Sequence, residues 1–468
     1  MSSSLSRRAL LRLLSLGPVA SALPACGGGG GASGGEGSGG DAGRVLVIGA
    51  GVSGLAAASA LRAAGREVVV IEARDRIGGR TWTTDFGGAP VDLGAAWMHS
   101  TDGNPVADFA RRNDIGWRPA EVIDETIAAY DPHEGFVSLT DLVEYVAATQ
   151  SGFEESVGDL RRALGPGASL APAIDLYLDR IGLSGARRRW ADFGIRQGIV
   201  ELFYGGPADL TSLDAIFEDS EFEGGNQFPD GGYTRVVAAL ASGLDVRTGE
   251  VVETIRRDER GVTVETSRAT HRGTHAIVTL PLGVLKSGTI RFEPELPERK
   301  SSAIARLDMG NFEKVVLRFP RPFWLDAGNH TTVWFSDTYG EFPIQFDLSR
   351  FTGRSDLLCF SGGRFARSLA DRSDDEVFAR VLAILREVRG ASVPDPELAV
   401  RTRWLADPFA RGSYSYIPVG ATPDDMVALG EPADARLLFA GEATVPAYYG
   451  TVAAAMISGL READRLLS

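Results

Sequence analysis

A glycine-rich turn between two apolar runs is the clearest feature of the hydrophobic pattern. The run VLVI at 45–48 leads into GAGVSG, the small-residue segment LAAASALRAAG fills 55–65, and a second run, VVVIE, ends at residue 72. Short apolar runs on either side of a helix-length segment are typical of a strand, a helix and a parallel strand. The pattern therefore predicts that residues 44–98 begin an α/β fold with a βαβ unit.

Helical and strand patterns alternate along the rest of the chain. Apolar residues recur every three or four positions within about 104–224, which predicts a mostly helical region. Residues 228–280 return to strands, with alternating polarity and a charged turn at 258–261. Three apolar runs within 311–361 predict a mixed or antiparallel sheet, and 436–467 is again a strand followed by a helix. The domain that begins with the βαβ unit is therefore expected to include segments from both ends of the chain.

The glycines of the first turn have the spacing of a dinucleotide-binding fingerprint. Gly49 allows the tight turn, Gly51 lets the backbone approach a pyrophosphate, and Gly54 lets the helix pack closely on the strand. The pyrophosphate would then lie at the positive end of the helix. Glu72 ends the second strand, where a carboxylate accepts the ribose hydroxyls of an adenosine and disfavours a 2′-phosphate. The sequence thus predicts NAD or FAD rather than NADP.

The segment IGGR at 77–80 bears on the choice between these two cofactors. It places two glycines and Arg80 directly after the second strand. An arginine there can donate two hydrogen bonds to the pyrophosphate of a cofactor that lies extended across the domain. The alternative is an ordinary solvated cation in a loop.

Composition and charge narrow the class of partner. The 468 residues allow two or three domains with sizeable cores, and 44% apolar and 24% charged residues are ordinary for a globular protein. The net charge of −14 argues against a nucleic-acid partner and is compatible with cationic substrates.

The first residues have the features of an export signal. Paired arginines in SRRALLR (6–12) precede an apolar run too short to span a bilayer, and this order resembles a twin-arginine signal. LPAC at 23–26 resembles a lipoprotein processing site, with Cys26 as the lipidated residue. The alternative is that Cys26 belongs to a cleaved signal. Residues 1–26 are thus expected to direct export and lipid anchoring at the cell envelope or in the periplasm, and 27–43 to form a glycine-rich linker.

The other cysteine and the histidines do not suggest a disulfide or a metal. Cys359 lies in the apolar run DLLCFSG and is expected to be a buried strand residue. His271 and His275 have a spacing that binds metal on a helix, but their segment has the pattern of a hairpin. We therefore assign no metal site.

Several long segments are similar to one enzyme family. RWLADPFARGSYSYIPVG (403–420), LLFAGEATVPAYYGTVAAAMISGLREA (437–463), LPLGVLKSGTIRFEPELPERK (280–300) and DMGNFEKVVLRFPRPFW (308–324) closely resemble the flavin-dependent amine oxidases. That family includes polyamine oxidases, monoamine oxidases and lysine-specific histone demethylases. DLGAAWMHSTDGNP (92–105) looks most like the polyamine and spermine oxidase branch.

The resemblance runs from about 44 to 466 and implies a two-domain α/β fold. It implies a discontinuous Rossmann-like FAD-binding domain of the glutathione-reductase type, with an interleaved α+β substrate-binding domain. The FAD-binding domain would comprise residues 44–110, 225–305 and 405–468. The substrate-binding domain would comprise 111–224 and 306–404, and the resemblance is weakest within its first segment, where the substrate is selected.

Lys314 is the principal catalytic candidate. It resembles the lysine that holds a water molecule against the reactive nitrogen of the flavin. A lysine on a strand is usually solvated, but in FEKVVLRF it shares a face with Phe312 and Val316 by the two-residue period of a strand. Lys286, in LGVLKSG, is instead expected to be a turn residue.

Other side chains complete the reacting end that the resemblance implies. Tyr414 resembles one wall of an aromatic cage, and Thr451 stands where monoamine oxidases carry the opposite tyrosine, as in polyamine oxidases. Trp404 resembles a tryptophan near the flavin ring, with ordinary core packing as the alternative for both aromatics. His99 matches a residue that lines the substrate tunnel, with a satisfied loop histidine as the alternative. Glu201 is a weaker candidate for an acidic tunnel residue.

The resemblance also assigns cofactor contacts. Glu442 resembles the acid that hydrogen-bonds the ribityl–pyrophosphate stretch of FAD, with a cap for the last helix as the alternative. Thr451 and Val452 begin that helix, whose dipole would stabilise negative charge on the reduced flavin. Val252 matches a backbone contact of the adenine, and Ser413 stands where monoamine oxidases carry a flavin-bonded cysteine, so non-covalent FAD is expected. The remaining predicted cofactor contacts are Arg74, Gly79, Gly94, Ala95, Ala96 and Trp97.

The reaction implied is oxidation of a carbon–nitrogen single bond in a small amine, with dioxygen as the electron acceptor. The alternatives are an L-amino acid oxidase, a desaturase or protoporphyrinogen oxidase, a non-catalytic flavin-binding envelope lipoprotein or redox sensor, and a nicotinamide dehydrogenase. The export signal and the lack of room for a long helical arm argue against histone demethylation. The pattern leaves the particular amine and the oligomeric state open.

Overall fold

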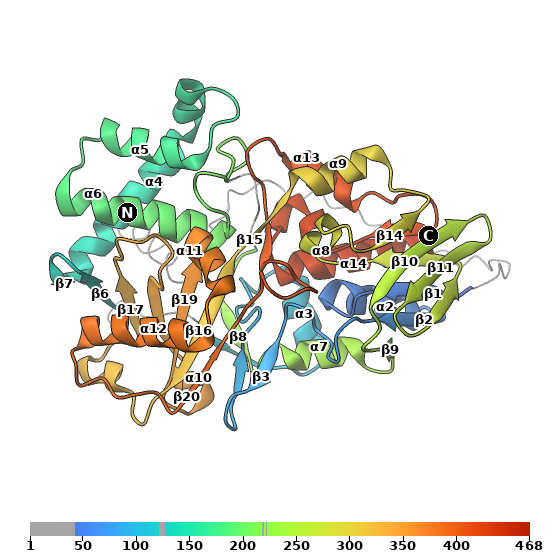
Figure 1. Cartoon of the computed structure of the whole chain (residues 1–468), viewed down its shortest axis with the longest axis horizontal. Helices are drawn as coiled ribbons and strands as arrows, with labels where there is room; N and C mark the ends of the chain where they lie inside the picture. Colours follow the sequence, from blue (N-terminus) through green and yellow to red (C-terminus); the bar gives the residue numbers. More distant parts are fainter. Residues whose placement is uncertain (1–42, 121–126, 218–219, 221) are drawn as a thin grey trace.

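The structure is a computed structural model that describes residues 43–120, 127–217, 220 and 222–468. The predicted export signal, Cys26 and nearly all of the predicted linker at 27–43 lie outside these residues. Within the described part of the chain, no helix combines the length and apolar character needed to cross a membrane. Two sheet-containing parts lie side by side (Figure 1), and the predicted mixed α/β class is confirmed.

A parallel five-stranded sheet forms the centre of one part. Its order is β22-β13-β1-β2-β9, and each neighbouring pair is parallel. The first two strands have every residue buried, as expected for strands covered on both faces. Helices α2 (Val52–Ala63) and α14 (Val452–Leu467) pack together beside this sheet, with Ser53 Oγ 3.1 Å from Ser458 Oγ. The strands are β1 (Val45–Ile48), β2 (Val68–Ile71), β9 (Asp245–Arg247), β13 (His275–Val278) and β22 (Leu437–Phe439).

A four-stranded sheet, ordered β12-β11-β10-β14, packs its apolar face on the five-stranded sheet. The predicted charged turn at 258–261 joins β10 to β11 as a hairpin. His271 lies in β12 and His275 in β13, so both are on strands, but the predicted hairpin is formed by β11 and β12 and does not include His275, whose strand belongs to the five-stranded sheet. These strands are β10 (Val252–Asp258), β11 (Gly261–Thr266), β12 (Thr270–Gly273) and β14 (Arg291–Glu293).

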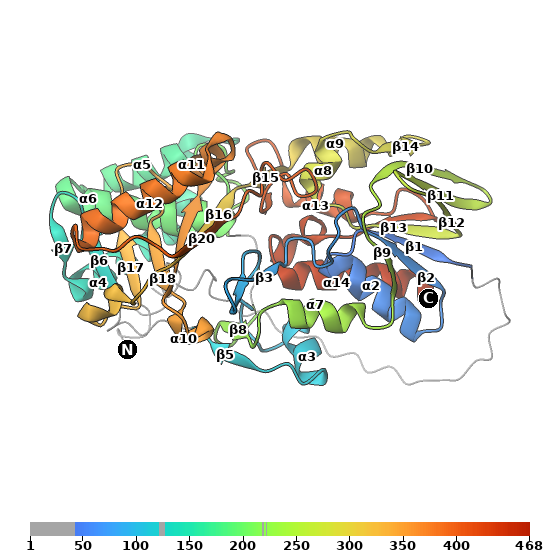
Figure 2. The same ribbon diagram turned by 60° about the horizontal axis from the view of Figure 1, so that its bottom comes forward.

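A seven-stranded sheet, ordered β20-β16-β19-β18-β17-β6-β7, forms the centre of the other part. It is antiparallel apart from the β17–β6 pair, which agrees with the predicted mixed or antiparallel sheet. Helix α12 (Asp374–Arg389) covers one face, and its first turn is closed by a capping box between Ser373 and Glu376 (Figure 2). The strands are β6 (Ile127–Asp131), β7 (Gly135–Val137), β16 (Phe312–Arg318), β17 (Thr331–Trp334), β18 (Ile344–Asp347), β19 (Asp356–Gly362) and β20 (Leu398–Arg401).

The described residues of the region predicted to be mostly helical, 104–224, also include strands β5, β6 and β7. All of these strands lie between α3 and α4, and β6 pairs with β17 far along the chain. The periodicity of a short strand such as IAAYD cannot show a partner that distant, which is why the prediction missed it. The elements are α3 (Pro105–Arg112), β5 (Trp117–Pro119), α4 (Leu139–Leu164), α5 (Leu170–Arg180), α6 (Gly185–Asp192) and a π-helix, η2 (Phe193–Tyr204).

A short ladder links the two parts next to the cavity described below. β15 pairs with β21 antiparallel, and β15 leads directly into β16, whereas β21 begins at Tyr414. Lys314 and Tyr414 are thereby brought together although a hundred residues separate them in sequence. The remaining elements are β3 (Thr83–Asp85), β4 (Pro90–Asp92), β8 (Gln227–Pro229), α7 (Thr234–Ala241), α8 (Leu282–Lys286), α9 (Glu298–Arg306), β15 (Asp308–Gly310), η3 (Phe323–Ala327), α10 (Ser349–Thr352), α11 (Gly363–Ser368), η4 (Leu369–Asp371), β21 (Tyr414–Tyr416), α13 (Pro423–Gly430), η5 (Glu442–Thr444) and η6 (Pro446–Tyr448).

Candidate active site

A cavity of about 450 Å³ runs from the glycine turn after β1 to the seven-stranded sheet. Gly49 and Gly51 line one end, and Phe312, Lys314 and Tyr414 line the other. The cavity thus joins the residues predicted to bind a cofactor to those predicted to react with a substrate. Within the described residues, no group of three or more histidine, cysteine or acidic side chains is placed to hold a metal ion.

The three fingerprint glycines have distinct surroundings. Gly49 has a φ of +106°, which favours glycine. A Cβ at Gly54 would lie 2.0 Å from the carbonyl oxygen of Gly49, so this glycine is required for packing of α2 on β1 and does not line the cavity. A Cβ at Gly51 would meet nothing within 4 Å. The space in front of the α2 N-terminus is therefore open, as a bound phosphate requires.

Glu72 and Arg74 line the cavity beside this turn. The buried Glu72 carboxylate accepts hydrogen bonds from the backbone amides of Ala50 and Arg74, both at 2.8 Å. Each carboxylate oxygen keeps a lone pair for a further donor such as a ribose hydroxyl. The Arg74 guanidinium is paired with Asp407 at 2.8 Å and lies over the ring of Phe409.

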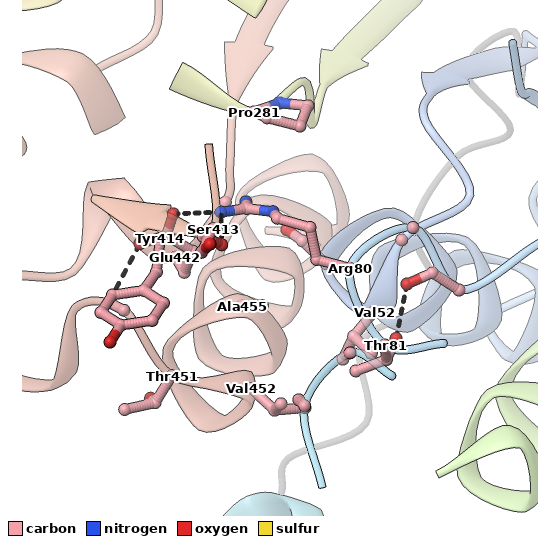
Figure 3. Close-up of a pocket in the computed structure, with 18 of the residues that line it drawn as sticks. Val52, Arg80, Thr81, Pro281, Ser413, Tyr414, Glu442, Thr451, Val452 and Ala455 are labelled. Atoms are coloured by element: carbon pink, nitrogen blue, oxygen red, sulfur yellow. Dashed lines mark hydrogen bonds and ion pairs between the residues drawn. The ribbon is translucent and has the colours of Figure 1, made fainter. Parts of the chain in front are cut away.

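Arg80 crosses the cavity to the C-terminal part of the chain (Figure 3). Its Nη1 donates to Glu442 Oε1 at 2.7 Å and to the Ser413 carbonyl at 3.1 Å. Glu442 also accepts from Ser415 Oγ at 2.6 Å and from the Gly450 amide at 3.0 Å. The arginine is therefore not a solvated loop cation, and Glu442 joins three separate segments at the cavity wall.

The N-terminus of α14 faces the same cavity, with Thr451 and Val452 among its lining residues. Thr451 is the N-cap, because its hydroxyl accepts a hydrogen bond from the Ala454 amide at 3.0 Å. The alternative in which Glu442 caps this helix is therefore wrong. A group with negative charge at this wall of the cavity would be stabilised by the helix dipole.

Lys314 is buried in the wall of the cavity, with 3% of its surface exposed. Its Nζ donates to the carbonyl oxygens of Asp92 at 3.0 Å and Gly94 at 2.5 Å, and lies 5.4 Å from the centre of the Trp97 ring. Burial lowers the pKa of Lys314 to about 8, although the Asp92 carboxylate opposes the shift. A lysine with this pKa exchanges protons near neutral pH.

Aromatic rings surround the cavity next to Lys314. The Tyr414 hydroxyl donates to the Leu202 carbonyl at 2.8 Å, which fixes the orientation of the ring. Trp404 is buried with its ring edge-on to Trp82, at 6.2 Å between centroids. Both predicted aromatics line the cavity.

His99 and Glu201 have different outcomes. His99 lines the cavity, its Nδ1 lies 3.3 Å from Asn226 Oδ1, and burial lowers its pKa to about 4, so the ring is neutral. Glu201 does not line the cavity, and the expectation of an acidic tunnel residue there is wrong. Its carboxylate accepts a hydrogen bond from Gln197 Nε2 at 2.8 Å and packs against Gly363. The residues that follow it in the π-helix line the cavity in its place.

Comparisons with known proteins identify the family to which this chain belongs. The model of the family described as "Flavin containing amine oxidoreductase" matches residues 52–467. The chain belongs to this family.

Relatives within this family fall into two groups. The chain is 36% identical over 439 residues to FLOWERING LOCUS D of Arabidopsis thaliana, a match that covers 90% of this chain and 55% of that protein. It is 34% identical over 436 residues to polyamine oxidase 3 of Oryza sativa subsp. japonica, covering 90% and 88%. Lysine-specific histone demethylase homologues match at similar identity, and the chain spans about half the length of these relatives.

A solved structure also shares the fold. Wild-type putrescine oxidase bound to putrescine superposes with a TM-score of 0.75 at 21% identity, covering 91% of this chain and 98% of that one. Family membership confirms the predicted flavin cofactor, FAD. The open space at Gly51, the two helix N-termini and the free lone pairs of Glu72 fit such a dinucleotide.

The remaining predicted cofactor contacts also lie at the cavity. Four of them lie in the segment before α3, one lies at the start of β10, and two lie in the turn after β2. Gly94 is also needed for packing, since a Cβ there would lie 1.9 Å from the Arg80 carbonyl oxygen. Lys286 was predicted to be a turn residue, but it is the last residue of helix α8. It does not line the cavity, and its Nζ donates to three backbone carbonyls at the end of α9. The lining residues are Gly79, Arg80, Gly94, Ala95, Ala96, Trp97 and Val252.

Among the lining residues that were not predicted, four lie near the reacting end. Leu202, Phe203 and Tyr204 end the π-helix, and the ring of Tyr204 stacks on that of Tyr449 at 6.0 Å. The paired aromatics in LFY and AYYG were the signal that could have identified them. Their direction into the cavity depends on the helix register, which the sequence pattern does not show.

Proposed function

We propose that this chain is an FAD-dependent oxidase of amines. It would oxidise a carbon–nitrogen single bond of a polyamine-like or other small amine to an imine, which hydrolyses to an aldehyde and an amine while dioxygen is reduced to hydrogen peroxide. The observation that carries the proposal is the buried Lys314, which shares one cavity with the Gly51 turn and the Tyr414 ring. Membership of the amine oxidoreductase family and the polyamine oxidase relative support it.

The cofactor half of the proposal concerns how FAD is held. Bound FAD supplies the acceptor for two electrons and a hydrogen from the substrate carbon. The parallel sheet and its glycine turn support a discontinuous Rossmann-like domain made of residues 44–110, 225–305 and 405–468. The Ser413 hydroxyl donates to the Phe312 carbonyl at 2.8 Å, and a serine provides no thiol for a covalent bond to flavin.

Lys314 would hold and move protons beside the substrate. A charged ammonium has three donors, and the carbonyls of Asp92 and Gly94 take two of them. The third is left for a water molecule or for the substrate nitrogen. With a pKa near 8, the side chain can give up or accept a proton at little cost.

The aromatic rings would exclude water and keep the substrate amine neutral. Tyr414, Trp404 and Tyr449 line the cavity, and a low-polarity wall disfavours an ammonium group. The nitrogen lone pair is needed to expel hydride from the neighbouring carbon. The same rings orient the substrate against one face of the cavity.

The N-terminal segment supports a proposal about location. We propose export by a twin-arginine route and lipid attachment at Cys26, on the evidence of the arginine pair and the LPAC motif alone. Radiolabelled fatty acid should then be incorporated into the wild-type chain expressed in bacteria and not into Cys26→Ala. Incorporation into both chains, or into neither, would contradict the anchor.

The proposed activity is tested by mixing the purified flavoprotein anaerobically with single amines and following the flavin absorbance. The panel contains spermidine, putrescine, phenethylamine, an Nε-methyl-lysine peptide, leucine and phenylalanine. Bleaching by one of the amines supports the oxidase. Bleaching by the amino acids alone indicates an L-amino acid oxidase, and no bleaching by any compound indicates a flavin-binding protein without this activity.

A further inference from the structure

Glu313 is a buried carboxylate that the proposed reaction does not use. It precedes Lys314 in β16, so the two side chains leave the strand on opposite faces. Only 2% of its surface is exposed, and it does not line the cavity. Burial raises the pKa of Glu313 to about 7, and its hydrogen bonds act against this shift.

The donors around Glu313 come from the segment that follows β20. One carboxylate oxygen accepts from the Trp404 amide at 2.8 Å, and the other accepts from the Thr402 hydroxyl. The Leu405 amide also faces the carboxylate. The positive charge of Arg401 acts against this rise in the pKa of Glu313. The Arg401 guanidinium donates hydrogen bonds to Asp374 and to two backbone carbonyls.

Thr402 extends this contact to Lys314. Its hydroxyl oxygen accepts from the Lys314 amide at 2.8 Å, and its own amide donates to the Lys314 carbonyl at 2.9 Å. The Glu313 carboxylate is therefore bonded directly to the backbone of Trp404 and, through the Thr402 side chain, to the backbone of Lys314. Both of these residues line the cavity. Those two residues are the proton carrier and an aromatic wall of the proposed oxidase.

The donor set explains why a glutamate is present. The neighbours present a hydroxyl and backbone amides, all of which donate, and a carboxylate is the side chain that accepts on both oxygens. A glutamine has a single acceptor oxygen and would place its NH₂ group against one of these donors. An alanine would leave the Trp404 amide without its side-chain acceptor.

We propose that Glu313 is a positioning residue of the active site, which holds Lys314 and Trp404 in register through Thr402 and the Trp404 amide. This inference rests on the proposed function for its kinetic consequences, whereas its structural consequence is independent of any substrate.

The test compares Glu313→Ala, Glu313→Gln and Thr402→Val with the wild-type flavoprotein. The rate of anaerobic flavin reduction per bound flavin should fall on the order of tenfold in Glu313→Ala, because small displacements of reacting groups are costly. Glu313→Gln keeps one acceptor oxygen and should recover only part of that rate, and the amine concentration for half-maximal rate should stay within about twofold of wild type. Glu313→Gln and Thr402→Val should be non-additive when combined, because they break one network.

A spectroscopic measurement and a matched control separate positioning from simple stability. The visible circular dichroism of the bound flavin should change in Glu313→Ala and recover in part in Glu313→Gln. Glu201→Gln is the control, because burial also raises the pKa of Glu201 to about 7 and its carboxylate does not reach the cavity. That control should lower the melting temperature at most, with the dichroism and the rate per flavin unchanged.

The outcomes distinguish the two proposals. If Glu313→Ala lowers only the melting temperature, as the control does, Glu313 is a structural residue and this inference is wrong. If no amine reduces the wild-type flavin, the proposed function fails, and the dichroism of the wild type, the two Glu313 variants and the Glu201→Gln control alone decides the positioning role.

Discussion

The two ends of the cavity are built in different ways. The cofactor end is built around the Gly49 and Gly51 turn and the α2 N-terminus, whose backbone is supplied by one short stretch of chain. The reacting end is made of side chains from β16, β21 and the π-helix, and backbone carbonyls of other segments hold Lys314 and Tyr414. Backbone geometry is encoded locally, whereas the placement of these side chains depends on contacts between distant segments.

The largest effect should come from the reacting end. Lys314→Met keeps the length of the side chain and removes its proton, so we expect the rate of flavin reduction or reoxidation to fall by about 100-fold. The flavin content should stay near wild type, because the cofactor end is untouched. Stopped-flow absorbance with the best amine measures both half-reactions.

Lys286→Met is the control for this substitution. Lys286 is partly buried and bound to carbonyls, but it does not line the cavity. Its rate per flavin should equal that of wild type. Equal losses in both variants would mean that Lys314 contributes to folding rather than to the reaction.

The pH dependence should also differ between the two ends. Below the ionisation of the substrate amine, each unit of rising pH increases the fraction of the reactive neutral amine about tenfold. We expect the reduction rate at low amine concentration to rise about tenfold from pH 7 to pH 8. His99 should not contribute, because its pKa is about 4 and the ring is neutral throughout.

The affinity for FAD should change little over the same pH interval. Parallel titrations of the apoprotein with FAD provide this comparison. A flat reduction profile between mild acid and mild base would contradict the requirement for a neutral amine.

At the cofactor end of the cavity, Gly51 is expected to affect FAD binding and Gly54 to affect folding stability. Gly51→Val places methyl groups in the open space at the α2 N-terminus, so FAD should dissociate about tenfold more readily, a change of about 1.4 kcal/mol. Gly54→Ala would crowd the Gly49 carbonyl and lower the free energy of unfolding by about 1–3 kcal/mol. FAD titration and urea unfolding of the apoproteins measure the two effects. Comparable destabilisation of both apoproteins would argue against separate roles.

The smallest effect should come from Tyr414→Phe. The ring remains, but its hydrogen bond to the Leu202 carbonyl is lost, which costs about 1 kcal/mol or roughly a fivefold change in rate. The loss should appear in kcat/KM for the amine and leave the flavin content unchanged. A rate equal to wild type would show that packing alone orients the ring.

Much of the fold was predictable because its signals are local. The βαβ start, the hairpin at 258–261 and the buried strand around Cys359 all follow from short patterns. Strand β6 was missed because its partner, β17, is distant in sequence. The prediction for Glu201 was wrong because the π-helix changes which side chains face the cavity.

The sequence by itself determined the glycine turn, the acid at the end of β2 and the residue types of the reacting end, because neighbours in the chain create the required backbone and chemistry. The tertiary structure decided that Lys314 donates to the carbonyls of residues 92 and 94, that Arg80 meets Glu442, and that Glu313 contacts the segment after β20. These contacts join segments that are far apart in the chain, and their geometry is set only when both sheets and the short β15–β21 ladder pack together.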